Sequence, residues 1–90
     1  MYNLPQGLKQ CDQDQRLFPL AWKEAYFRMN YNEKVKGYIC PACQQVFRDP
    51  KGFKELKCDH IHPFSKGGLT VWENLQLLCA RCNRKKSNTV

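Results

Sequence analysis

Hydrophobic side chains recur at helical spacing in RLFPLAWKEAYFRMN, residues 16–30. Their separation by three or four positions is that of one face of an α-helix. The residues on this face are Phe18, Trp22, Ala25 or Tyr26, and Met29. Pro19 suits the first turn of a helix, where its missing N–H is not needed. The pattern predicts an amphipathic helix over residues 19–30 whose aromatic stripe packs into the core, with contact to a partner as the alternative.

Alternation of apolar and polar residues marks two short segments in the second half of the chain. In ELKCDHI, residues 55–61, Leu56 and Cys58 fall on one face and charged residues on the other, as in a half-buried strand. NLQLLC, residues 74–79, predicts a second strand, and ARCNRKKSN, residues 80–88, predicts a closing helix. We therefore expect a small α+β domain.

Proline and glycine separate these elements. RDPKG at residues 48–52 predicts a turn, and SKGG at residues 65–68 predicts a loop. The first 15 residues are polar and carry a proline and a glycine, so they predict an irregular arm. We expect residues 1–37, which are this arm and the amphipathic helix, to pack on a core formed by residues 38–90.

The length and composition point to one soluble domain. Ninety residues are enough for a single domain. Its core is small, which favours additional stabilisation by a metal site or by disulfides. The chain shows no signal-peptide pattern and no apolar run near the roughly 20 residues that cross a bilayer. We expect a cytoplasmic protein without a membrane partner. Thiols stay reduced there, so paired cysteines more often bind metal than form disulfides.

The chain is strongly basic, with a formal net charge of +7. Such a charge favours a polyanionic partner, most simply nucleic acid, although a solvated basic surface is an equal alternative. The cluster near the C-terminus is more specific than the total, and it consists of Arg81, Arg84, Lys85 and Lys86.

Four of the six cysteines form two C-x2-C pairs, Cys40 with Cys43 and Cys79 with Cys82. This spacing lets both thiolates of a tight turn reach one ion, and two such turns complete the tetrahedral shell of structural zinc. Two disulfides or four core cysteines are the alternatives. A closed four-cysteine site keeps no position for water, so any catalysis lies elsewhere. Cys11, in the arm, is assigned no role.

The stretch CDHIHP, residues 58–63, supplies further candidate ligands that the zinc shell does not need. A carboxylate at Asp59 suits Mg²⁺ or Mn²⁺, and a histidine at His60 suits a base near neutral pH. Neighbours in a strand point to opposite faces, so these two side chains meet only if the chain bends. Cys58 is most simply a small core residue.

The stretch CDHIHPFSKGGLTVWENLQLLCARCNRKKSN resembles the HNH endonucleases, which have the ββα-metal (His-Me finger) fold. The resemblance covers about residues 38–90 and includes the CPAC half of the zinc site. Its specific features are an acid–His pair, a double-glycine loop, ENLQLLC, and a cysteine pair that leads into Asn and Lys. Residues 1–37 resemble nothing comparable.

The resemblance implies roles for four residues. His60 would be the general base that activates the attacking water, and Asp59 would be a metal ligand. Asn74 would hold the hairpin loop through backbone hydrogen bonds and so orient His60. Asn83 stands where many members have histidine, which makes this an HNN variant with an oxygen ligand. This change favours Mg²⁺ or Mn²⁺ as the catalytic ion.

Several residues are candidate contacts to phosphate. His62 could touch the scissile phosphate, or it could be a loop histidine hydrogen-bonded to backbone. The basic candidates, each of which could equally be a solvated charge, are Lys66, Arg84, Lys85 and Lys86. Contacts of this kind position DNA without reading its sequence.

The resulting hypothesis is metal-dependent hydrolysis of double-stranded DNA, leaving 5′-phosphate and 3′-hydroxyl ends, with structural Zn²⁺ and catalytic Mg²⁺ or Mn²⁺. We expect a monomer that nicks one strand with low sequence specificity; a dimer would cut both. The first rival is a non-catalytic zinc-ribbon module that binds nucleic acid, and the second is a structural interaction domain. RNA as the substrate stays open.

Overall fold

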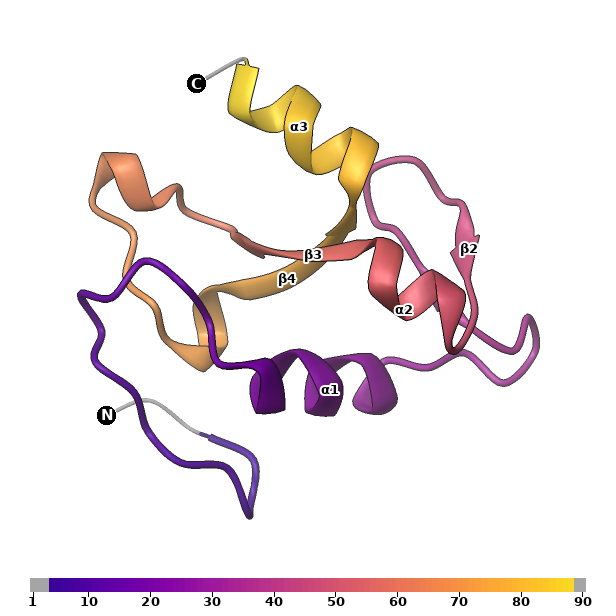
Figure 1. Ribbon diagram of the computed structural model, residues 1–90, viewed down its shortest axis with the longest axis horizontal. Coiled ribbons are helices and arrows are strands. Elements are labelled where there is room, and N and C mark those ends of the chain that lie inside the picture. The colour runs from indigo at the N-terminus through magenta and orange to yellow at the C-terminus, as the bar shows by residue number, and fades with distance from the viewer. Residues whose placement is uncertain (1–3, 89–90) are drawn as a thin grey trace.

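An antiparallel hairpin lies at the centre of the computed structural model, which describes residues 4–88 (Figure 1). Its strands are β3 (Leu56–His60) and β4 (Leu75–Cys79), in a register that sets Leu56 opposite Cys79. Residues 1–3 of the expected arm and residues 89–90 lie outside the described residues.

Helices cover the hairpin on two sides (Figure 1). Helix α1 (Leu20–Met29) lies on one side, and α3 (Ala80–Asn88) leaves the end of β4 on the other. Residues 77–79 of β4 are all buried, without the alternation of a half-exposed strand. A strand covered on both faces has this continuous apolar character. Together β3, β4 and α3 form a ββα unit, and α1 packs against it.

A smaller ladder precedes this unit in the chain. Strands β1 (Tyr38–Ile39) and β2 (Val46–Phe47) pair antiparallel, and the short helix α2 (Lys51–Glu55) follows. Gly52 lies so close to β2 that a Cβ there would meet the backbone of Phe47 at 2.6 Å. Glycine is therefore required for the close packing of α2 on β2. The remaining regular elements are two 3₁₀ turns, η1 (Phe64–Lys66) and η2 (Trp72–Asn74).

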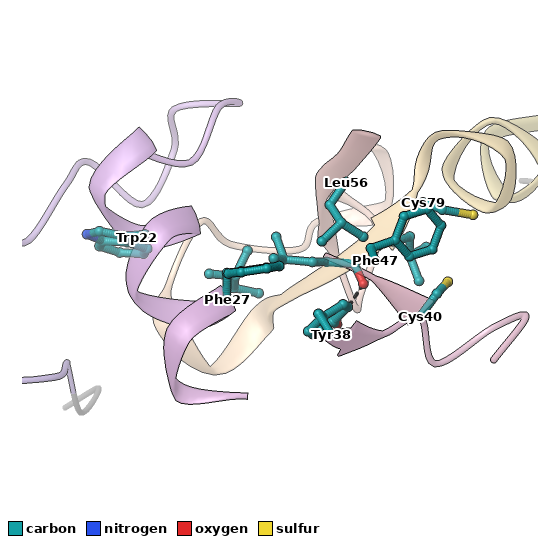
Figure 2. Packing of buried hydrophobic residues seen from close by; sticks show 10 residues of the cluster. Trp22, Phe27, Tyr38, Cys40, Phe47, Leu56 and Cys79 are labelled. Atoms are coloured by element: carbon teal, nitrogen blue, oxygen red, sulfur yellow. Dashed lines mark hydrogen bonds between the residues drawn. The ribbon is translucent and has the colours of Figure 1, made fainter. Parts of the chain in front are cut away.

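The core joins α1 to both ladders (Figure 2). Trp22 and Phe27 enter it from α1, and Leu56 and Leu77 are completely buried in the hairpin. The Tyr38 hydroxyl donates a hydrogen bond of 2.7 Å to the carbonyl of Leu77, so β1 is tied to β4 inside the core. Among residues 4–88, no helix is long and apolar enough to cross a membrane.

The elements predicted from periodicity agree with the structure in kind and closely in bounds. The amphipathic helix spans residues 20–29, the two strands span 56–60 and 75–79, and the closing helix spans 80–88. The small mixed α/β class is confirmed. Residues 48–52 were predicted as a turn, but α2 begins within them at Lys51.

The apolar face of α1 differs from the prediction at one position. Met29 was placed in the core but is 62 % exposed, because it is the last helical residue and the chain turns away at Asn30. Phe27 is buried instead, with its ring edge-on to that of Phe53 at 5.2 Å and close to Tyr38. The buried face therefore turns toward the small ladder.

Truncation of the core should be costly. Leu77→Ala removes a side chain that is completely buried between the helices, and it should lower the free energy of unfolding by about 2–5 kcal/mol. Urea unfolding of the zinc-loaded protein measures this. Leu20→Ala is the matched control, because Leu20 is 65 % exposed and its loss should leave the unfolding midpoint nearly unchanged. Equal midpoints for the two variants would contradict this description of the core.

Candidate functional site

Four cysteine sulfurs meet where the two ladders end. Cys40 follows β1, Cys79 ends β4, and Cys82 lies in the first turn of α3. With Cys43, their Sγ atoms all lie within 4.8 Å of one another, and those of Cys43 and Cys79 are 3.8 Å apart. Tetrahedral zinc with Zn–S bonds of about 2.3 Å sets sulfurs about 3.8 Å apart. The cluster matches a zinc site, and its thiols are free rather than paired in disulfides.

The electrostatics of the cluster also call for a cation. Burial raises the pKa of the Cys40 thiol, but N–H groups of Cys79, Cys43 and Ala42 outweigh it and lower this pKa to about 7. The pKa of Cys82 is raised to about 12, first by its hydrogen bond with Cys79 and next by burial. Four thiolates this close repel one another. All four can therefore stay deprotonated and act as ligands only when a positive ion binds between them.

A cleft of about 410 Å³ opens beside β3, away from the cysteine cluster. It is bounded by the arm, the end of β3, the following loop and α3. Arg16 of the arm and Lys57 of β3 line it together with four predicted site residues: Asp59, His60, Asn83 and Lys86.

The Asp59 carboxylate accepts three hydrogen bonds from side chains of β4 and α3. Its Oδ2 accepts hydrogen bonds from Gln76 Nε2 at 2.8 Å and from Lys86 Nζ at 2.6 Å. Its Oδ1 accepts a longer one, 3.4 Å, from Asn83 Nδ2. Asn83 directly follows Cys82, so the turn that carries the cysteine cluster also brings this amide to Asp59. The two predicted ligands of the catalytic metal are thus neighbours.

A positive charge already lies at this carboxylate. Besides its ion pair with Asp59, the Lys86 ammonium donates to the carbonyls of His60 at 2.7 Å and Ile61 at 3.3 Å. The Asp59 side chain is only 11 % exposed. Carboxylate, amide and carbonyl oxygens form the hard donor set that suits Mg²⁺ or Mn²⁺. The residues therefore fit a divalent ion, which would compete with the ammonium.

His60 lies on the opposite face of β3, against the arm. Its ring packs on that of Phe18, with centroids 4.4 Å apart, and near that of Phe64 at 5.4 Å. Its Nε2 forms a hydrogen bond of 2.8 Å with the Thr70 hydroxyl, which in turn donates to the carbonyl of Gln15. The imidazole is therefore held both by stacking and by a hydrogen bond.

The surroundings of His60 favour its neutral form. Desolvation is the largest effect and lowers the pKa of the imidazole below its usual range. Asp59 opposes this shift, whereas Arg16 and Lys86 add to it. This shift favours the uncharged ring, which is the form that a proton acceptor needs.

Asn74 ties together the two sides of the loop that follows His60. Its Oδ1 accepts from the N–H of His62 at 2.8 Å, and its Nδ2 donates to the carbonyls of His62 at 3.1 Å and Leu69 at 2.9 Å. Its own carbonyl accepts from the N–H of Ile61 at 2.9 Å. Asn74 thus helps to set the path of the chain directly after His60, where Lys86 also bonds the carbonyls of His60 and Ile61.

The other predicted contacts lie outside the cleft. His62 Nε2 donates to the carbonyl of Lys66 at 3.0 Å, so this ring nitrogen is used within the loop. Lys66, Arg84 and Lys85 are exposed. Lys85 lines a second hollow, beside the cysteine cluster, together with Lys86 and Arg81.

Sequence patterns did not point to the contributions of the arm. Arg16 lines the cleft with its guanidinium 5.8 Å from the Phe64 ring centre, and Phe18 covers His60. Thr70 and Gln76, which bond His60 and Asp59, were given no role from the sequence either, although Gln76 lies within ENLQLLC. The helical spacing of Phe18 was the nearest signal, but it indicated packing only.

A comparison with protein families identifies the class of this domain. The HNH endonuclease model matches residues 40–89, more than half of the chain, and the chain therefore belongs to the HNH endonuclease family. Membership indicates a nuclease that acts on nucleic acid. No curated protein and no solved structure matches the chain. The matched residues include the cysteine cluster, Asp59 and His60 but not the arm.

Loss of one cluster cysteine should abolish zinc binding. Cys79→Ser removes a ligand at the corner between β4 and α3, so we expect loss of bound zinc and of the cooperative melting transition. Metal analysis and circular dichroism measure these. Cys11→Ser is the matched control and should keep both, because Cys11 lies outside the cluster. A variant Cys79→Ser with full zinc content and normal melting would contradict a structural zinc site.

Removal of the Lys86 ammonium should strengthen binding of a divalent ion. Lys86→Met frees Asp59 of its ion pair, and we expect the affinity of zinc-loaded protein for Mn²⁺ to rise severalfold, up to about tenfold. Isothermal titration calorimetry measures it, with Lys85→Met on the same helix as the control. Unchanged or weaker binding by Lys86→Met would show that the ammonium does not compete with the ion.

Proposed function

We propose that this protein is a metal-dependent DNA endonuclease that hydrolyses phosphodiester bonds. The observation that carries the proposal is the meeting of Asp59, Asn83 and His60 at one cleft. A structural zinc site alone needs none of these three residues. Their chemistry, a carboxylate, an amide and a neutral imidazole, is that of a hydrolytic site with one divalent ion.

His60 is the general base in this proposal. It accepts a proton from the attacking water as the oxygen bonds to phosphorus and the P–O3′ bond breaks, which leaves 5′-phosphate and 3′-hydroxyl ends. Packing on Phe18 restricts the ring to one orientation. Asn74 supports the same geometry from the loop that follows, through its bonds to His62 and Leu69.

Asp59 and Asn83 would hold the catalytic Mg²⁺ or Mn²⁺ through their oxygen atoms, once the Asn83 amide, whose Nδ2 faces Asp59, has turned its oxygen toward the ion. When bound, such an ion polarises the scissile phosphate and stabilises the leaving oxygen. With only two protein ligands, several positions stay available for water and phosphate oxygens. The zinc held by the four cysteines is structural and keeps Asn83 close to Asp59.

Double-stranded DNA is the proposed substrate, and the positive charge of the chain suits its phosphate backbone. The net charge of +7 attracts the phosphate backbone, and the exposed residues Lys66, Arg84 and Lys85 supply contacts that position it, whereas the Lys86 ammonium is engaged by Asp59. His62 contributes a further contact beside the loop. Such contacts read no bases, so cleavage has low sequence specificity. A monomer that cuts with the Asp59–His60 cleft breaks one strand at a time and is therefore a nicking enzyme.

A non-catalytic nucleic-acid-binding module is the second candidate. It is favoured by the ion pair between Lys86 and Asp59, which engages the carboxylate that a catalytic metal needs. It leaves the packing of His60 at the cleft without a purpose, and we therefore prefer the nuclease.

Substitution of the base discriminates between these functions. His60→Ala should reduce nicking of supercoiled plasmid in Mg²⁺ or Mn²⁺ by at least about 100-fold, whereas DNA affinity, zinc content and melting should stay close to wild type. The products are resolved on an agarose gel, and affinity is measured by fluorescence anisotropy.

His62→Ala is the matched comparison, two residues along the same segment. It should weaken DNA binding while it keeps most of the maximal rate. Direct appearance of linear DNA would reveal a dimer that cuts both strands. If wild type and His60→Ala both leave the plasmid supercoiled, the binding module becomes the better description.

A further inference from the structure

Thr70 fastens the N-terminal arm to the cleft. It is completely buried, and its N–H donates to the carbonyl of Gln13 at 2.9 Å. Its hydroxyl donates to the carbonyl of Gln15, and its own carbonyl accepts from Cys11 Sγ at 3.7 Å. Three contacts within a short length of arm make Thr70 the point where residues 11–15 join the loop before β4. In Figure 1 the arm runs beside this loop.

The same hydroxyl is bonded to His60, and this determines which ring nitrogen carries the proton. A threonine hydroxyl has one proton to donate and lone pairs to accept with. A carbonyl can only accept, so the Thr70 proton is directed at Gln15. The remaining contact, 2.8 Å from Oγ1 to His60 Nε2, therefore requires the ring nitrogen to donate. In the neutral ring, Nδ1 is then left with a free lone pair.

We propose that Thr70 and the backbone carbonyl of Gln15 form a relay that keeps His60 in its Nε2–H form, so that Nδ1 is the nitrogen that accepts the proton from water. Thr70 is a positioning residue, because it acts on the reaction only through His60. The inference rests on the proposed role of His60 as the base. It implies that the arm helps to position this base through the carbonyl of Gln15.

The arm supports this relay in two further ways. Phe18 lies on the face of the His60 ring and opposes rotation that would exchange the two nitrogens. At the other end of the arm, Trp22 Nε1 donates to the carbonyl of Lys9 at 3.0 Å, which anchors the arm to α1. All these arm residues precede residue 40, where the family match begins. The relay thus joins His60 and Thr70, inside the matched region, to an arm that lies outside it.

The first test needs no variant. Long-range ¹H–¹⁵N NMR of uniformly labelled, zinc-loaded wild-type protein at neutral pH distinguishes a protonated from an unprotonated ring nitrogen. We expect His60 to show a protonated Nε2 and an unprotonated Nδ1. A protonated Nδ1 would overturn the proposal, whether or not the protein cleaves DNA.

Thr70→Val then removes the hydroxyl at nearly constant volume. We expect the single Nε2–H form of His60 to be lost and the maximal nicking rate to fall about 10–100-fold with little change in KM, as for a base in the wrong form. Thr70→Ser keeps the hydroxyl and should restore the NMR signature and a rate within about threefold of wild type. Zinc content and melting verify that each variant folds.

Asp14→Ala is the matched control on the arm. Asp14 is exposed and belongs to neither end of the relay, so the bonds of Thr70 to Gln15 and His60 stay in place and both readouts should remain near wild type. If Thr70→Val keeps the wild-type NMR signature and rate, the relay is refuted while the endonuclease function stands. A correct NMR signature in a protein that cleaves no DNA would instead refute the function and keep the hydrogen-bond assignment.

Discussion

The convergence of four cysteine sulfurs at the corner between β4 and α3 is the constraint on which the rest of the site depends. Cys79 ends the strand and Cys82 lies in the first turn of the helix, so the cluster determines how α3 leaves the hairpin. Asn83 comes next, and Lys86 lies about one turn further along the same helix. Both side chains thereby reach Asp59 on β3. In a domain with a small core, a metal-held corner keeps such a geometry more rigid than apolar packing alone.

The alternation of side chains along β3 divides the site between two parts of the chain. Asp59 faces α3, which supplies the amide and the ammonium around its carboxylate. His60 faces the arm, and the Phe18 ring of the arm packs on its imidazole. Thr70, which is itself bonded to the arm, forms a hydrogen bond with the same ring. The strand ends at His60, and the cleft at this end is open to both faces. The carboxylate and the imidazole are therefore positioned by different parts of the chain although both line the same cleft.

Local spacing explains which features could be predicted. The two C-x2-C pairs, the alternation around Leu56 and the helical stripe around Trp22 each involve residues a few positions apart, and the structure has the corresponding elements. The sequence pattern did not predict that Phe27 rather than Met29 is buried in the core. This depends on where the helix ends and on which elements pack beneath it. The short helix α2 was not predicted either, since proline and glycine signal a turn regardless of the packing that follows.

The sequence by itself determined the chemical inventory: four thiols with zinc spacing, an acid and a histidine at a strand end, and an excess of positive charge. Only the tertiary structure decided how these groups are used. The Lys86 ammonium lies on Asp59 instead of facing outward, and the Thr70 hydroxyl joins His60 to the carbonyl of Gln15, a residue 55 positions away in the chain. Bonds between segments so far apart form only after the elements have packed. Periodicity and spacing report the local preferences of the chain. They do not indicate which residues far apart in the sequence come into contact when the elements pack.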